Sequence, residues 1–439
     1  MSKKVIVTVG AVILAVVMSL AGMRALSKRD STATPERAMR TPDTRATSTD
    51  RQIQLAEARI KNVPSLSEGY SLLAAAYMQK ARETGDFGFN ARAESALNRS
   101  LEIAPDDRAA LTLHATLLLT YHRFKEALEE AKRAEESGLG SADFYGVMTD
   151  ALVELGDYHE AIKAAQKMMD LRPDSASYSR VSYLRALHGD LEGAIEAMRV
   201  AVKAANPSNP ENAAWYRVHL GLELMNAGKR DEGERQFDIA MEIFPDYHVA
   251  LAAKARARAA SGDLESAVEF YSRAQERVPL PDTVIALGDL YAKLRRADEA
   301  KRQYELVQFI EREGAGGNTY SRQLALFWAD HDMRLDEALE VMRRERSVRA
   351  DIYTSDALAW CLYKKGQTLE AKREIDSALR LGTRDAAILY HAGMIYRALG
   401  DYRIGGKYLK QALAINPFFQ VLQAEVARQT LDTLPRGRS

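Results

Sequence analysis

A small side chain recurs along this chain at a spacing of about 34 residues, and that recurrence limits the fold more than any other feature. Counting from Ala161 and allowing short insertions, an alanine or glycine returns at Ala127, Ala194, Gly233, Ala267, Ala300, Ala338, Ala371 and Gly405. A fixed period of this size is typical of architectures in which each repeat packs only against its neighbours. We therefore expect one elongated solenoid, although 439 residues would ordinarily suggest two or three globular domains.

The stretch Ala142–Ser175 shows what one repeat contains. It is typical of two amphipathic helices that are joined at Gly156 and closed by Pro173, which cannot continue a helix. Ala161 and Ala165 allow close packing of the second helix, and the apolar stripe between the helices is expected from Leu152, Leu155, Tyr158 and Ile162. A single hairpin cannot bury its apolar face alone, so neighbouring hairpins must stack.

A proline and a turn glycine return with the same period. The prolines are Pro105, Pro173, Pro245, Pro279 and Pro417, and the glycines are Gly156, Gly189, Gly228, Gly262, Gly366 and Gly400. With the sets Gly233, Phe237, Ala240, Pro245 and Ala267, Tyr271, Ala274, Pro279, this pattern resembles the tetratricopeptide repeat. The resemblance implies an all-α, right-handed superhelical solenoid of about ten hairpins over roughly residues 66–418. It says little about function, since this repeat serves many roles.

The two ends of the solenoid are expected to be capped, so that it covers residues 51–432. Asp50 should cap a helix that runs through Ile60, and Phe418–Leu431 should form the last helix. Residues 433–439 are expected to be a disordered tail. The sequence of the block Arg322–Phe419 resembles that of bacterial multi-repeat proteins that are exported or membrane-anchored and have no agreed biochemical activity.

Residues 1–23, at the N-terminus, are predicted to be a membrane signal. Val5 to Met23 is 19 residues without a charge, about the length that crosses a hydrocarbon core of roughly 30 Å as a helix. An uncleaved anchor and a signal peptide both fit, because Ser19-Leu20-Ala21 has the form of a cleavage site. Residues 24–50 are polar and predicted to be a disordered tether. We expect the repeats to lie on the extracytoplasmic side of the membrane.

Charge and cysteine content exclude several functions. Lysine plus arginine equals aspartate plus glutamate at 61 each, so no overall field favours nucleic acid. The single cysteine, Cys361, excludes an internal disulfide and a cysteine zinc site.

No catalytic or cofactor site is predicted. The eight histidines are spread over separate repeats without a ligand spacing, and Asp330-His331-Asp332 falls at a turn, where polar residues cap or solvate. Cys361, beside Trp360, is interpreted as a small core residue, and Gly314–Gly317 does not follow a strand as a phosphate loop would. No metal ion or cofactor is expected, and an enzyme is the least favoured of three function classes.

The inner wall of the solenoid is the expected site of function. The resemblance implies that the first helices of successive hairpins line a concave groove. In the last three repeats its expected lining is Tyr320, Phe327, Tyr353, Asp356, Trp360, Tyr363, Lys364, Tyr390 and Arg397. Earlier repeats contribute Asp143, Asp150, Glu154, Asp282 and Asp289, with Arg180 and Arg256 between them. Several rings, above all Trp360 and Phe327, can equally fill the hairpin core, because an error of one residue in register turns each ring inward.

The favoured function is a non-enzymatic scaffold tethered at a membrane that binds extended or helical segments of protein partners in its groove. The alternative is a component of envelope polysaccharide assembly or export whose aromatic groove contacts glycan or a synthase.

Overall fold

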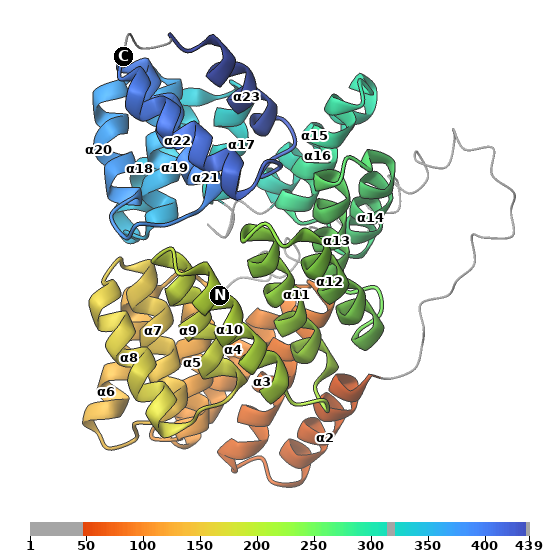
Figure 1. The fold of residues 1–439 in the computed structure, drawn as a ribbon. Coiled ribbons are helices and arrows are strands. Elements are labelled where there is room, and N and C mark those ends of the chain that lie inside the picture. The colour runs from red at the N-terminus through yellow and green to blue at the C-terminus, as the bar shows by residue number, and fades with distance from the viewer. Residues whose placement is uncertain (1–46, 314–320, 436–439) are drawn as a thin grey trace, which may run out of the picture. The chain divides into compact units, whose positions relative to one another are not determined.

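The computed structural model describes residues 47–313 and 321–435, and within these ranges the chain forms 22 α-helices and no strand (Figure 1). The first helix is α2 (Ser48–Asn62) and the last is α23 (Gln423–Thr433). Between them lie ten helical hairpins: α3 (Ser67–Thr84) with α4 (Gly88–Ile103), α5 (Arg108–Thr120) with α6 (Phe124–Glu136), α7 (Ala142–Glu154) with α8 (Tyr158–Leu171), α9 (Ser175–Leu187) with α10 (Leu191–Ala204), α11 (Pro210–Asn226) with α12 (Arg230–Ile243), α13 (His248–Ala260) with α14 (Leu264–Arg277), α15 (Pro281–Lys293) with α16 (Ala297–Glu313), α17 (Ser321–Asp330) with α18 (Leu335–Val348), α19 (Ile352–Lys364) with α20 (Thr368–Ala378), and α21 (Ala386–Ala398) with α22 (Tyr402–Ile415). The all-α class implied by the resemblance to the tetratricopeptide repeat is confirmed for the described residues.

A glycine followed by an aspartate sets the turn inside several hairpins. Gly156, Gly189 and Gly400 have φ between +77° and +83°, the left-handed conformation that ends a helix at little steric cost to glycine. The aspartate that follows each glycine caps the next helix. Asp190, for example, accepts a hydrogen bond from the amide of Gly193 at 3.0 Å. The dipeptide therefore ends one helix and starts the next.

The recurring small residues lie where the two helices of a hairpin cross. Ala161, Ala194 and Ala371 have no exposed surface. A Cβ on Gly233 would lie 2.6 Å from the carbonyl oxygen of Gly221, and one on Gly405 would lie 2.8 Å from that of Gly393. These crossings leave no room for a larger side chain.

One part of the predicted stripe is wrong. Ile162 is 46% exposed and faces away from the first helix of its hairpin. It directly follows the buried Ala161, and one residue along a helix turns the side chain by about 100°.

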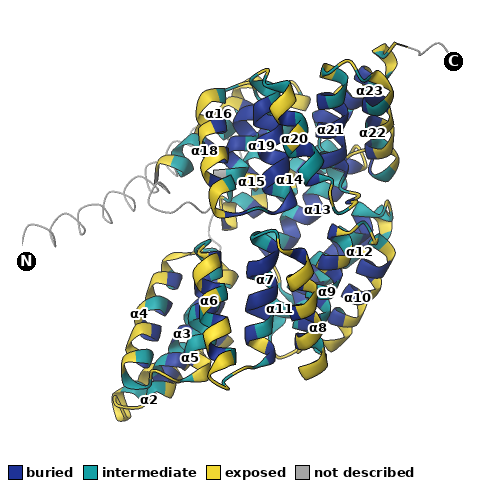
Figure 2. Ribbon diagram, turned by 90° about the vertical axis from the view of Figure 1, so that its left-hand side faces the viewer, coloured by how far each residue is buried: buried dark blue, intermediate teal, exposed yellow. Residues whose placement is uncertain are grey.

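First helices are more deeply buried than second helices. In α7 the buried residues include Phe144, Val147 and Leu152, and almost all of α19 is buried, whereas α8 and α20 keep exposed outer faces (Figure 2). A first helix packs against its own second helix and against the neighbouring hairpins on both sides.

Turns of the chain about 190 residues apart also touch each other. A Cβ on Gly156 would lie 2.5 Å from the carbonyl oxygen of Ala350, one on Gly189 would lie 2.5 Å from that of Gly382, and one on Gly85 would meet the side chain of Val278. The same sequence separation recurs at three places. Hairpins about 190 residues apart in the sequence therefore contact each other at a regular interval along the solenoid.

One of these contacts is a buried ion-pair network. Arg349, at the C-terminal end of α18, is 6% exposed and binds Glu154 of α7 and, at 3.2 Å, Asp351. The amide of Ala350 donates to the carbonyl oxygen of Glu154 at 2.8 Å, and the amide of Ile352 donates to the Tyr158 hydroxyl at 2.9 Å. Backbone and side-chain bonds together join the α7–α8 turn to the α18–α19 connection.

The caps differ in detail from those expected. Helix α2 begins at Ser48, so Asp50 lies in its first turn and does not precede it. Helix α23 begins at Gln423 and not at Phe418, because Asn416–Leu422 forms a connection that buries Phe419 against Tyr390 at 5.4 Å between ring centroids.

The predicted membrane segment, residues 1–23, and most of the tether, residues 24–46, lie outside the described residues. So do Gly314–Tyr320 and the end of the tail, residues 436–439. Among the helices that the structure describes, none combines the length and the hydropathy that crossing a bilayer requires.

Candidate partner-binding groove

A cavity of 420 Å³ lies where the first helices of seven consecutive hairpins come together. Each of α9, α11, α13, α15, α17, α19 and α21 contributes at least one lining residue, from Tyr183 in α9 to Ala386 in α21. The connection between α22 and α23 also lines it, through Phe418 and Phe419. The cavity is thus the part of the inner wall that most hairpins share.

The cavity lining carries more negative than positive side chains. Its acidic residues are Glu223, Asp282, Asp289, Asp330 and Asp385, and its basic residues are Arg256 and Arg384. Asp289 accepts from the Tyr304 hydroxyl at 2.9 Å, Asp330 accepts from the indole of Trp360 at 2.8 Å, and Asp385 caps α21. These three carboxylates are held by the protein itself.

The other two carboxylates have no hydrogen-bond or ion-pair partner among the described residues. Glu223 is partly buried, its Oε2 atom is buried and unpartnered, and burial raises the pKa of this carboxyl to about 7, with Asp385 adding a like charge. Burial also raises the pKa of Asp282, although its side chain is exposed. The exposed surface and the raised pKa of Asp282 both fit a carboxylate that contacts solvent inside the cavity and has protein on most sides.

Aromatic rings share the wall with these charges. Tyr183 is 40% exposed and lines the cavity from α9, while Tyr353 lines it from α19 and Phe327 from α17. Burial raises the pKa of both tyrosine hydroxyls, so they are neutral donors at physiological pH. Neutral hydroxyls, rings and carboxylates together form a surface suited to a ligand with both apolar and cationic parts.

Of the nine groove residues expected from the sequence, four are buried. Phe327, Trp360, Tyr390 and Asp356 lie in the interface between hairpins. Trp360 is 3% exposed; its ring lies 4.2 Å from that of His391 and stacks on Tyr363. These rings stabilise the last hairpins and leave little area for a partner.

Asp356 binds the imidazole of His391, with 2.9 Å between Nδ1 and one carboxylate oxygen. The Asp356 charge contributes to a raised pKa of His391 despite the opposing effect of burial. The pair lies inside the protein and is not part of the cavity lining.

The remaining expected residues are partly buried or not described. Tyr353, Tyr363, Lys364 and Arg397 keep part of their surface exposed. Lys364 binds Asp332 at 2.7 Å, and Tyr353 alone of the four lines the cavity. Tyr320 lies outside the described residues.

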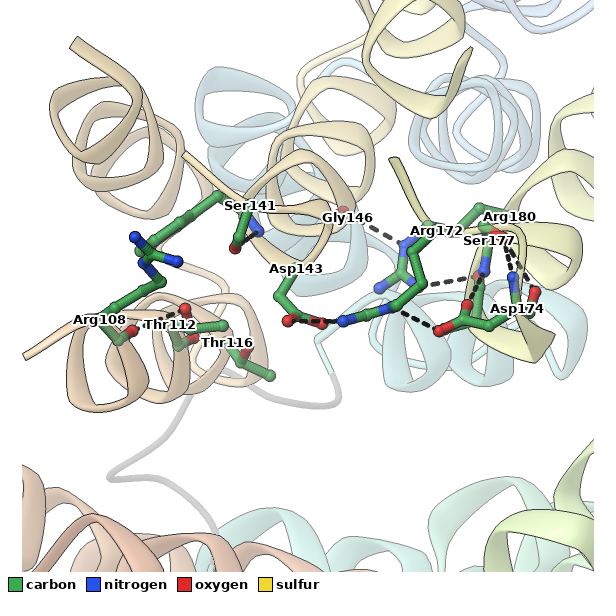
Figure 3. A network of polar contacts seen from close by, with 12 residues as sticks. Arg108, Thr112, Thr116, Ser141, Asp143, Gly146, Arg172, Asp174, Ser177 and Arg180 are labelled. Atoms are coloured by element: carbon green, nitrogen blue, oxygen red, sulfur yellow. Dashed lines mark hydrogen bonds and ion pairs between the residues drawn. The ribbon is translucent and has the colours of Figure 1, made fainter. Parts of the chain in front are cut away.

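The acidic residues of the earlier repeats are mostly paired. Arg180 binds Asp150 with two hydrogen bonds, of 2.9 and 2.6 Å, and Arg172 bridges Asp143 and Asp174 (Figure 3). Glu154 forms an ion pair with Arg349. Bidentate pairs of this kind hold their groups firmly, so this wall offers less free charge than the sequence suggests.

Glu223, Asp330 and Asp385 line the cavity but were not among the groove residues predicted from the sequence. A signal was present for Glu223, which stands in the apolar run Leu220 to Met225. An acid at such a position must either find a partner or face a cavity. Asp385 was hidden because it also acts as an ordinary helix cap.

The described residues show neither a metal-ligand cluster nor an activated cysteine. Residues 47–313 and 321–435 contain no group of three or more acidic, histidine or cysteine side chains placed to hold a metal ion. Cys361 is fully buried, and burial raises its pKa to about 12, so it is present as the neutral thiol.

Comparison with known families accounts for the hairpins. A family model of the tetratricopeptide repeat matches residues 148–210 and 219–280, and a second model of the same repeat matches residues 386–419. The chain contains tetratricopeptide repeats. The matched segments agree with hairpins that the structure shows between α7 and α14 and at α21–α22.

Proteins with similar sequences match the repeats over part of their length. DnaJ homolog subfamily C member 3 of Gallus gallus is 22% identical over 214 residues, which cover 46% of this chain and 42% of that protein. Tetratricopeptide repeat protein 36 of Mus musculus is 29% identical over 126 residues, or 26% of this chain and 66% of that protein. A putative pentatricopeptide repeat-containing protein of Arabidopsis thaliana is 33% identical, with 35% of its length covered. The chain thus spans less than half the length of the first and third of these relatives.

Among solved structures, yeast Tom70 is similar over 88% of this chain and 93% of its own, with 13% identity and a TM-score of 0.36. A tetratricopeptide repeat protein from Parabacteroides merdae has 18% identity, a TM-score of 0.34, and coverage of 59% and 97%. The tetratricopeptide repeats of this chain are shown by the family models and by its hairpins.

Proposed function

We propose that this protein is a scaffold that binds a segment of a protein partner in the cavity on its inner wall. The observation that carries the proposal is the convergence of seven first helices on one cavity, lined by rings and by two carboxylates without partners in the described structure. Clefts that combine apolar walls with a few polar groups are the usual binding sites of proteins. A volume of 420 Å³ admits a few side chains of a segment but not a folded domain.

We further propose that the scaffold is tethered at a membrane. The support is the uncharged run Val5 to Met23 and the polar stretch after it. In this proposal the repeats lie on the extracytoplasmic side. Polysaccharide is the less favoured occupant, because Trp360, the ring best suited to stack on a sugar, is buried.

Site-specific photocrosslinking in the native cell tests the binding function. Benzoylphenylalanine in place of Tyr353 would lie on the cavity wall, and the same residue in place of Leu369 would lie on the outer face of α20, where Leu369 is 71% exposed. We expect a discrete protein adduct from position 353 and none from position 369. Equal labelling at both positions, or no adduct at position 353, would contradict the proposal.

A further inference from the structure

The chemistry of the cavity also specifies what kind of segment it binds. This inference rests on the proposed function and goes further by naming the charge of the occupant. We propose that the cavity binds an extended peptide segment of a protein partner through lysine or arginine side chains, with Glu223 and Asp282 as the groups that recognise the cation.

Carboxylates outnumber basic groups in the cavity lining. Five carboxylates and two guanidinium groups line the same 420 Å³. Three of the carboxylates are satisfied by Tyr304, Trp360 and the amides at the start of α21, which leaves Glu223 and Asp282 without partners among the described residues. The unpaired Oε2 atom of Glu223 is buried, which is costly, and a cationic donor from a ligand removes that cost. Asp282 is exposed, so its charge is open to the same donor.

The cavity's own arginines do not pair with these carboxylates. Arg256 and Arg384 line the cavity with the acidic residues, and neither forms an ion pair among the described residues. Arg322 lowers the pKa of Asp282 by its charge, but its ion pair is with Asp351, at 3.2 Å. The carboxylates therefore remain available to a cation from outside. The raised pKa values of Glu223, Asp330 and Asp385 agree with acidic groups crowded together in a poorly hydrated space.

The cavity wall also favours a particular shape of ligand. The rings of Tyr183 and Tyr353, which keep part of their surface exposed, stand on the same wall as the carboxylates. The aliphatic stem of lysine or arginine packs on such rings while its charged end reaches a carboxylate. Because the wall is built from seven successive hairpins, an extended segment can contact several of them at once.

Capped pentapeptides provide the test, with fluorescence anisotropy as the readout on the full chain. The probes are Ser-Lys-Phe-Lys-Ser, Ser-Gln-Phe-Gln-Ser and Ser-Glu-Phe-Glu-Ser, acetylated and amidated so that the side chains alone carry charge. The cavity variant is Glu223→Gln with Asp282→Asn. The matched control is Glu129→Gln with Glu196→Gln, which removes the same charge from exposed positions on α6 and α10.

We expect the lysine peptide to bind wild type and the control equally, and to bind the cavity variant about tenfold to a hundredfold more weakly, the range for losing a hydrogen bond to a charged group. Arg256→Gln should keep or strengthen binding, since it removes a competing cation. Thermal unfolding of each variant separates lost binding from lost fold. Equal binding of the lysine peptide to wild type and the cavity variant, or equal binding of the glutamine peptide to wild type, would overturn the proposal.

The crosslinking experiment distinguishes a failure of the cationic-segment proposal from a failure of the proposed partner-binding function. Adducts at position 353 whose crosslinked segments carry no lysine or arginine near the crosslink would overturn the cationic occupant and leave the scaffold function standing. No adduct at that position would remove the binding function itself.

Discussion

At the scale of single residues, the hairpins are specified by a few positions with narrow steric limits. Ala161, Ala194 and Ala371 are fully buried at helix crossings, and a Cβ on Gly233 or Gly405 would approach a backbone oxygen of the facing helix. Ile162, one residue from Ala161, is exposed. A shift of one residue therefore separates a position that tolerates no added volume from one that tolerates any side chain.

Ala300→Leu tests this limit. Ala300 is buried in α16, whereas Ala297 in the same helix is exposed. We expect Ala300→Leu to lower the free energy of unfolding by about 1–3 kcal/mol through overpacking, and Ala297→Leu to change it by less than about 0.5 kcal/mol. Urea unfolding followed by circular dichroism measures both. Similar losses in the two variants would mean that the recurring small residue does not lie at the crossing.

Residue patterns in the sequence predicted the hairpins well. They predicted poorly whether an individual aromatic ring lies in the groove or in the core. The 34-residue period follows from packing inside one hairpin, which is local in sequence. Whether Trp360 faces the groove or the core depends on Asp330 and His391, which lie on α17 and α21. Those contacts are set by how hairpins stack, and the composition of a single helix does not contain that information.

At the scale of elements, connections that are far apart in sequence hold one another. The α7–α8 turn and the α18–α19 connection share the Glu154–Arg349 pair and two backbone amide donors. The residues joined by these bonds are 194 and 195 positions apart in the sequence. No sequence pattern predicted this contact, because nearest-neighbour repeats do not reveal how many of them complete one turn of the solenoid.

Arg349→Met tests the strength of this contact. Arg349 is buried beside Glu154 and Asp351, and its removal would leave carboxylates without their cation. We expect a loss of about 3–5 kcal/mol, as for other broken buried pairs. Arg343→Met, on the exposed side of α18, should cost at most about 1 kcal/mol.

Hydrogen exchange locates the effect of Arg349→Met. The amides of Ala350 and Ile352 should exchange faster in this variant and remain protected in Arg343→Met. Unchanged protection of both amides in Arg349→Met would show that the contact is dispensable.

At the scale of the whole molecule, the cavity is a property of seven hairpins together. Its acidic groups come from α11, α15, α17 and the start of α21, and each helix alone appears ordinary. The resemblance to the tetratricopeptide repeat implied a groove, and of the residues expected there Arg256, Asp282, Asp289, Phe327 and Tyr353 line the cavity. The sequence could not predict which charges would face one another across the cavity.

The pH dependence of stability should report the buried carboxyl of Glu223. Its pKa is raised from 4.5 to about 7 in the folded protein. Between these values the folded state binds a proton that the unfolded state has lost, so the free energy of unfolding falls as the pH rises. Glu223→Gln removes this loss. The variant should gain stability relative to wild type between pH 5 and pH 8, by at most about 3 kcal/mol.

Urea unfolding at several pH values measures this difference. The exposed carboxyl of Glu129 supplies the control, and Glu129→Gln should show no comparable change with pH. A constant difference between Glu223→Gln and wild type over this range would contradict the raised pKa.

The contact between distant turns also bears on how this chain can evolve. Most solenoids gain or lose a repeat easily, because each repeat contacts only its neighbours. Here five hairpins, from α9–α10 to α17–α18, lie between the turn that holds Glu154 and the connection that follows Arg349. Duplicating or deleting one of the four hairpins from α11–α12 to α17–α18 would carry both Gly156 and Gly189 away from Ala350 and Gly382. The number of repeats in this segment is therefore fixed by geometry, and variation in length should concentrate at the two ends of the chain.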